Sequence, residues 1–160
     1  MRLLTIESIK LFDKDNNIKY EQKNIKNTLH QLGQFYMLNS LFANKNTRVD
    51  FYYAGLDNRT SLNTTDTMAS LVDEPSSNGY SRQKITSWSS PVISNSVYVV
   101  KSNSITFSSS STGWGPVRNI FLATTQNPSG FLISSVKLNQ ELTLKAGDTA
   151  ILIMNLSLSN

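Results

Sequence analysis

Four acidic residues lie close together in the middle of the chain: Asp57, Asp66, Asp73 and Glu74. Paired carboxylates are the groups that glycoside hydrolysis and calcium binding require, so these residues are the first candidates for chemistry. Their spacing lacks the alternating acids and central glycine of an EF-hand loop. Asp66 is better explained as an acid that caps a short helix, and Asp73 and Glu74 as the polar end of that helix. We therefore expect no catalytic residue, no metal site and no cofactor.

His30 is the only histidine, and the chain contains no cysteine. The absence of cysteine excludes disulfides, thiolate nucleophiles and cysteine-ligated metals. No Ser-His-Asp arrangement can be placed around His30 from the sequence. Because it follows Leu29 beside an apolar stripe, we interpret His30 as a packing residue.

Six aromatic residues are spaced as in strands. They are Tyr52, Tyr53, Tyr80, Trp88, Tyr98 and Trp114. Such residues can form a platform on which sugars or bases stack. Aromatic residues at a spacing of two are more often core or subunit-interface residues, and we favour that interpretation. The sequence from Gly113 to Gly115 is too short for a phosphate loop and no Walker lysine follows it.

Arg82 is a charged residue within an otherwise half-buried strand, Tyr80 to Ile85. We expect it to pair with Asp73 or Glu74, which would tie the loop before Gly79 to the strand after it. The candidate structural or interface residues are Asp73, Glu74, Tyr80, Arg82, Trp88 and Trp114.

The charge of the chain is mild. Fifteen basic and eleven acidic residues give a formal charge of +4 in 160 residues, without a basic run. This favours no nucleic-acid partner. No apolar stretch reaches the roughly 18 residues of a membrane span, and no signal peptide is recognisable, so we expect synthesis and assembly in the cytoplasm.

The C-terminal third is predicted to form the central sheet. Its strands are expected at 117–124, 131–138, 142–144 and 150–158. β-branched and alternating apolar residues support these strands. Asn127-Pro128 with Gly130, and Gly147-Asp148, supply the turns between them.

The N-terminal part is predicted to hold one helix, over residues 24–43, because apolar residues recur there at steps of three and four. Gly33 would weaken this helix by about 1 kcal/mol relative to alanine, which indicates close packing at that point. Residues 1–23 read as an arm or strand, with a bulge in the first strand. This segment is the one that we expect to be mobile or to reach a neighbouring subunit.

Fourteen serines between Ser76 and Ser111 raise the question of disorder. Apolar residues such as Val97, Val99 and Ile105 interrupt them at strand-like spacing, so we predict short strands with serine-rich outer faces. The total is eight to ten strands and one helix. The predicted fold is mainly β, an antiparallel β-sandwich of jelly-roll-like form, with one domain over residues 24–160.

The order of short motifs along the chain resembles that of small virion proteins of tailed bacteriophages. The motifs are Tyr53 to Arg59 (YAGLDNR), Asp66 to Ala69 (DTMA), Glu74-Pro75, Gly79 to Gln83 (GYSRQ), Trp88, Ser104 to Phe107 (SITF), Trp114 to Val117 (WGPV), Ile120 to Ala123 (IFLA), Ser129 to Leu132 (SGFL) and Ala146 to Asp148 (AGD). The resemblance covers about residues 27–158. It implies a non-enzymatic structural protein of the virion, of the capsid-decoration, head-fibre or tail-adaptor type. It also implies contacts with other virion proteins and a homo-oligomer, for which three copies is the expected number.

Two alternatives stay open on the residues alone. A carbohydrate-binding module that attaches to the host surface would need two or three of Tyr52, Tyr80, Trp88 and Trp114 exposed and coplanar. A glycan-degrading enzyme would need two of the carboxylates across one cleft.

Overall fold

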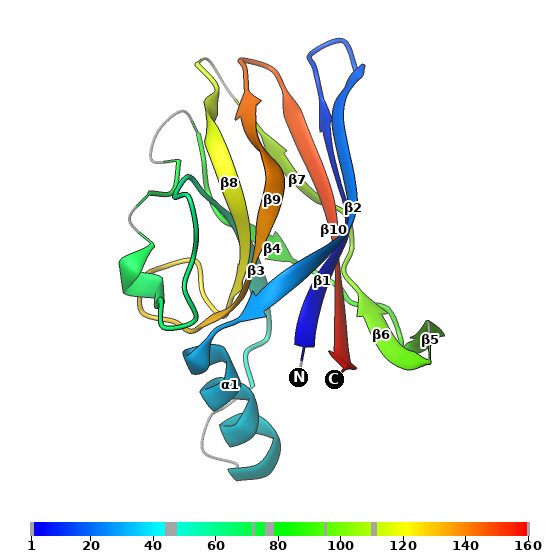
Figure 1. The fold of residues 1–160 in the computed structure, drawn as a ribbon, viewed down its shortest axis with the longest axis vertical. Helices are drawn as coiled ribbons and strands as arrows, with labels where there is room; N and C mark the ends of the chain where they lie inside the picture. Colours follow the sequence, from blue (N-terminus) through cyan, green and yellow to red (C-terminus); the bar gives the residue numbers. More distant parts are fainter. Residues whose placement is uncertain are drawn as a thin grey trace.

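The chain folds into two packed antiparallel sheets, with one helical segment at one end (Figure 1). The computed structural model describes residues 2–43, 48–71, 73–75, 79–94, 96–109 and 112–159. Ten strands lie within these ranges. The predicted β-sandwich is therefore confirmed.

The first sheet is built around the two chain ends. β1 (Arg2–Phe12) lies between β2 (Ile18–Leu29) and β10 (Thr149–Ser159). β10 also pairs with β6 (Val97–Lys101) and with β7 (Ile105–Ser108), and β5 (Val92–Ser94) forms the outer edge beside β6. The predicted bulge in the first strand is confirmed by a shift of register between Ile6 and Ser8.

The second sheet contains β9 (Leu132–Leu144), β8 (Trp114–Ala123), β3 (Tyr52–Asp57) and β4 (Gln83–Ile85) in that order. β2 joins the two sheets, since it pairs with β1 as far as Lys26 and with β9 from Asn27 onward. Asn24, just before this change of partner, has a positive φ of 53°. The predicted boundary at residue 23 thus falls within one continuous strand.

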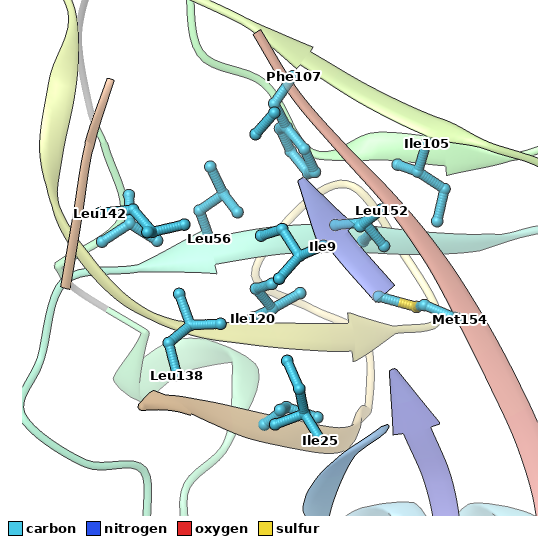
Figure 2. Close-up of a cluster of buried hydrophobic side chains, with 14 of the residues drawn as sticks. Ile9, Ile25, Leu56, Ile105, Phe107, Ile120, Leu138, Leu142, Leu152 and Met154 are labelled. Carbon is cyan, nitrogen blue, oxygen red and sulfur yellow. The ribbon is translucent and has the colours of Figure 1, made fainter. Parts of the chain in front are cut away.

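The core lies between the two sheets (Figure 2). Ile9 and Leu152 from the first sheet and Leu56 and Ile120 from the second are at most 1% exposed. Burial of each such side chain contributes about 1.5–3 kcal/mol, so the closure of the sandwich is driven mainly by these alternating inward positions.

The predicted helix over 24–43 was wrong for about its first third, residues 24–30. Residues up to Leu29 belong to β2, and the helix comprises α1 (Gln31–Leu38) followed by the wider π-helical turn η1 (Asn39–Ala43). Backbone pairing with β9 and the burial of Ile25 in the core outweigh the helical spacing of the apolar residues.

Gly33 confirms the predicted close packing of the helix. A Cβ at this position would lie 2.3 Å from the backbone oxygen of Ile133 in β9. The absence of a side chain thus lets α1 lie directly against the second sheet.

The strands predicted at 131–138 and 142–144 form the single strand β9. No glycine or proline lies between Leu138 and Leu142, and both residues are buried against the core, so nothing breaks the strand. The serine-rich segment contains β5, β6 and β7, as short strands were predicted there. The short helix predicted around Met68 is a 3-10 turn, η2 (Met68–Ser70), with Thr67 rather than Asp66 at its N-cap.

Candidate functional site

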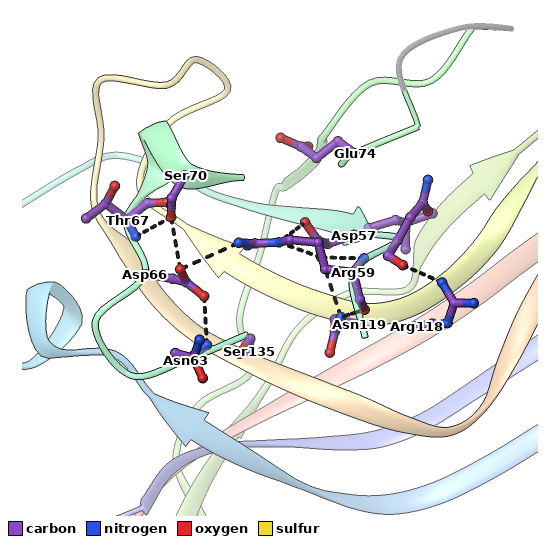
Figure 3. Close-up of polar contacts among 12 residues, drawn as sticks. Asp57, Arg59, Asn63, Asp66, Thr67, Ser70, Glu74, Arg118, Asn119 and Ser135 are labelled. Atoms are coloured by element: carbon purple, nitrogen blue, oxygen red, sulfur yellow. Dashed lines mark hydrogen bonds and ion pairs between the residues drawn. The ribbon is translucent and has the colours of Figure 1, made fainter. Parts of the chain in front are cut away.

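The carboxylates with the strongest claim to chemistry belong to a buried ion network at the end of β3 (Figure 3). Asp57 is 0% exposed, and the Nε of Arg59 lies 3.3 Å from each of its carboxylate oxygens. Arg59 also reaches Asp66, with Nη1 3.5 Å from Oδ1. Asn119 completes the network by donating to the carbonyl oxygen of Arg59 at 2.6 Å. One guanidinium therefore serves two carboxylates.

Asp66 also holds its own loop. Its Oδ2 accepts a hydrogen bond from the backbone N–H of Asn63 at 2.7 Å, and its Oδ1 accepts one from the Ser70 hydroxyl at 3.2 Å. Burial raises the pKa of the Asp57 carboxyl, and the neighbouring Arg59 opposes that rise. Because these groups are engaged with one another and Asp57 is fully enclosed, the arrangement supports a structural role and does not present two carboxylates across a cleft.

His30 has a partner that the sequence did not reveal. Its Nε2 lies 2.8 Å from the hydroxyl of Ser135 in β9, 105 residues along the chain. Burial lowers the pKa of His30 below its usual value. His30 is 0% exposed and Ser135 is 3% exposed, so a substrate cannot reach this pair. The interpretation of His30 as a packing residue agrees with this placement.

The structure pairs Arg82 with Glu74. The Nε of Arg82 donates to Oε2 of Glu74 at 2.9 Å, Nη2 donates to Oε1, and Nη1 donates to the carbonyl oxygen of Asn127 at 3.1 Å. The Tyr80 hydroxyl donates to the same carboxylate at 2.9 Å. Asp73 is exposed and contributes its carbonyl oxygen to the backbone N–H of Asn58. Arg82 thus ties the segment before Gly79 to β4, while its role at a subunit interface stays a prediction.

The four aromatic residues expected for a sugar platform do not share a plane. Trp114 is buried, and the Tyr80 ring meets it edge-on at 84°, with centroids 5.5 Å apart. Tyr52 meets Trp88 edge-on at 85° and 6.4 Å. These rings pack on one another rather than forming a coplanar exposed surface.

An apolar groove of about 680 Å³ lies between the helical segment and the β5–β6 hairpin. Figure 1 shows these two elements on either side of the chain ends. The helix contributes Tyr36, Met37, Ser40 and Leu41 to the groove lining, the hairpin side contributes Pro91, Ser96, Val97, Tyr98 and Val100, and Arg48, Tyr52, Leu156 and Ser157 complete it. Leu41 and Tyr98 are 67% and 66% exposed. Ile93, paired directly opposite Tyr98, is 68% exposed.

The opposite side of the helical segment carries a second apolar surface. Phe35, Leu38 and Phe42 follow one another at steps of three and four, which places them along one face, and they are 54%, 59% and 80% exposed. We refer to these three residues as the outer ridge. The periodic spacing of these residues predicted a helix, and they do lie within the helical segment α1–η1. Periodicity identifies an apolar face but not whether the same chain covers it.

Most of the chain, from within α1 to the end of β10, matches one known protein family. A family model described as "Podophage GP4 fiber I protein gp80" matches residues 36–159. The chain belongs to this family of phage fibre proteins. No curated protein and no solved structure gives a match to the chain.

As a member of the gp80 fiber I family, the chain is a structural component of a virion fibre and is located in the virion. The resemblance to virion proteins of tailed phages is thereby confirmed, as is association with other virion proteins. The matched span begins within α1 and includes both sides of the groove. In the described part of this gp80-family chain, no helix is long and apolar enough to cross a membrane, and no three metal-ligating residues cluster together.

Proposed function

We propose that the chain is a non-enzymatic structural subunit of the fibre and that it assembles through the groove end of the sandwich, on the capsid, neck or tail. The observation that carries this proposal is an apolar groove lined by the exposed side chains of Leu41 on η1 and Tyr98 on β6, with exposed Ile93 of β5 paired opposite Tyr98. Contiguous apolar surface of this kind is rare on proteins that act alone and is typical of binding surfaces. A homo-oligomer, with three copies as the number that the resemblance implies, is part of the proposal.

The polar residues of the chain support the same function. The carboxylates of the Asp57 network and the Arg82–Glu74 pair have partners within the chain, so they stabilise the domain instead of facing a substrate. The groove, in contrast, is lined mainly by apolar side chains. Protein surfaces of this composition form the core of protein–protein interfaces.

Sugar binding is the alternative function, and one observation favours it. Tyr98 is exposed at the groove beside Ser96 and Arg48, and a single aromatic face with nearby polar groups can hold a sugar ring. This alternative predicts that the purified chain binds a glycan in a screen and that Tyr98→Ala abolishes the binding.

The test of the proposed function is incorporation into the virion. Phage that carries Tyr98→Glu is purified, and the amount of the chain per particle is measured by quantitative mass spectrometry. Thr106→Glu, an exposed position on β7, is the matched control. We expect at least a tenfold loss of the Tyr98→Glu chain from the particles and normal incorporation of the control. Normal incorporation of a folded Tyr98→Glu chain would contradict assembly through the groove.

A further inference from the structure

The groove and the outer ridge lie on opposite sides of the same helical segment. We propose that the groove is filled by the outer ridge of a second copy of this chain, so that each copy gives its ridge to one neighbour and receives a ridge from another. This inference rests on the proposed function and specifies the partner at the groove. The contact is heterologous, and repetition of it closes a ring or extends a filament.

The positions along the helical segment separate the two surfaces. Tyr36, Met37, Ser40 and Leu41 line the groove, whereas Phe35, Leu38 and Phe42, which lie before, among and after them in sequence, form the outer ridge. At about 3.6 residues per turn the mean directions of the two sets are roughly opposite, and none of the three ridge residues lines the groove. A ridge therefore cannot enter the groove of its own chain.

The exposed area suits a contact that is repeated around an assembly. Leu41 and Tyr98 of the groove lining, Ile93 paired opposite Tyr98, and the three ridge residues have a mean exposure of about two-thirds. At roughly 200 Å² for a fully exposed large side chain, these six supply on the order of 800 Å² in one contact. The rest of the groove lining adds to this area and brings the contact toward the roughly 1,200 Å² of the smaller stable interfaces. Because each copy makes two such contacts, a closed ring is held more firmly than an isolated pair.

Charge supports the same partner. Arg48 lines the groove, and no carboxylate of the described residues lies within ion-pair distance of it. Phe42, one of the three ridge residues, lies in the last turn of the helical segment, where the aligned peptide dipoles place partial negative charge. A ridge that enters the groove thus brings the negative end of a helix toward an arginine.

A heterologous contact makes a prediction that a symmetric contact does not. Leu38→Glu disables the ridge but leaves the groove intact, and Tyr98→Glu disables the groove but leaves the ridge intact. Each variant alone is expected to be monomeric, while a mixture of the two forms a one-to-one complex, because one working ridge and one working groove remain. The masses are measured by light scattering and analytical ultracentrifugation across a hundredfold range of concentration, with circular dichroism as the check of folding.

Cross-linking tests the same contact while the apolar residues of the ridge and the groove, including Leu38 and Tyr98, stay unchanged. The chain has no cysteine of its own, so Ala43→Cys beside the ridge and Ser96→Cys in the groove give an unambiguous readout. Mixed and oxidised, these two proteins are expected to form disulfides between positions 43 and 96. Thr106→Cys serves as the control for random collision.

The outcomes separate this inference from the proposed function. Failure of the two glutamate variants to complement one another, or cross-links mainly between identical positions, would overturn the ridge-in-groove contact. A wild-type chain that is monomeric throughout, together with loss of Tyr98→Glu from virions, overturns the inference and leaves the proposed function standing with a different virion protein in the groove. Normal incorporation of Tyr98→Glu into virions overturns both.

Discussion

Two regions of this chain reverse the usual distribution of side chains. Around the end of β3, charged and polar groups such as Asp57 are buried, and at the groove end large apolar groups such as Phe42 and Tyr98 are exposed. The buried charges have partners within the chain, whereas the apolar side chains of Leu41, Phe42 and Tyr98 are about two-thirds or more exposed. The first region therefore stabilises the fold, whereas the second has the exposed apolar character that the proposed assembly contact requires.

The largest effect is expected at Asp57. Asp57→Ala should lower the free energy of unfolding by about 3–5 kcal/mol, because the guanidinium of Arg59 and the amide of Asn119 lose a buried acceptor. Asp57→Asn keeps the shape and one acceptor oxygen and should cost less. Urea unfolding followed by fluorescence measures both changes.

The matched control for Asp57 is Glu141→Gln. Glu141 pairs with Arg118 at 2.7 Å, but its side chain is 56% exposed, so this change should cost no more than about 1 kcal/mol. If Asp57→Ala and Glu141→Gln lower the free energy of unfolding equally, burial does not distinguish the Asp57 network from a surface ion pair.

Gly33→Ala is expected to have the next largest effect, about 1–3 kcal/mol of destabilisation. The sign is the decisive observation, because glycine to alanine in an open helix stabilises by up to about 1 kcal/mol. Here the added methyl group would meet the backbone of Ile133, so α1 must move away from β9 and the groove changes shape with it. The midpoint temperature of thermal unfolding and the mass of the associated species in solution should therefore both decrease. Gln34→Ala, at the neighbouring exposed position, should change neither.

The two regions also differ in how much of them could be predicted from the sequence. The Arg82–Glu74 pair was predictable because the two residues are eight positions apart and a turn brings them together. The hydrogen bond between His30 and Ser135 was not predictable, because it depends on the pairing of β2 with β9, two strands far apart in the sequence. Similarly, the spacing from Ile25 to Leu41 indicates a helix, but only the pairing of β2 with β9 shows that its first turn is a strand.

The exposed region shows a different limit to prediction from the sequence. The apolar spacing of Phe35, Leu38 and Phe42 was visible in the sequence and predicted a helix, but it did not show which side of the helix is covered. Nothing in a single sequence distinguishes a face covered by its own chain from one covered by a neighbour. Only the fractions of these side chains that the fold leaves exposed reveal the difference.

His30, in the buried region, should make the free energy of unfolding depend on pH, with an effect of intermediate size. Its pKa in the folded chain lies below its usual value of about 6.5, so below that pH the unfolded chain binds the proton first. The free energy of unfolding should therefore fall as the pH drops from about 6.5 toward the folded pKa, by up to about 1.4 kcal/mol per pH unit.

The readout for His30 is the midpoint of urea unfolding between pH 7.5 and pH 5. His30→Gln removes this titration and can still bond to Ser135, and the chain contains no second histidine. Asp66 favours the protonated imidazole and Arg59 disfavours it, so both remain unchanged in the comparison. A His30→Gln variant with the same pH dependence as the wild type would remove His30 from the explanation.

The smallest effect on folding is expected at the outer ridge. Leu38→Ala should change the stability of the monomer by no more than about 0.5 kcal/mol, because most of the Leu38 side chain, 59%, is already exposed to solvent in the folded chain. The same truncation at Leu152, which is 0% exposed, should cost about 2–5 kcal/mol. Both must be measured at a concentration where the chain is monomeric, since association stabilises the folded state by mass action. If Leu38→Ala hardly changes the stability of the monomer and yet weakens association, the ridge residue contributes to the contact with the partner and not to the stability of the fold. A loss comparable to that of Leu152→Ala would instead place Leu38 in the core and remove the contrast between the two regions.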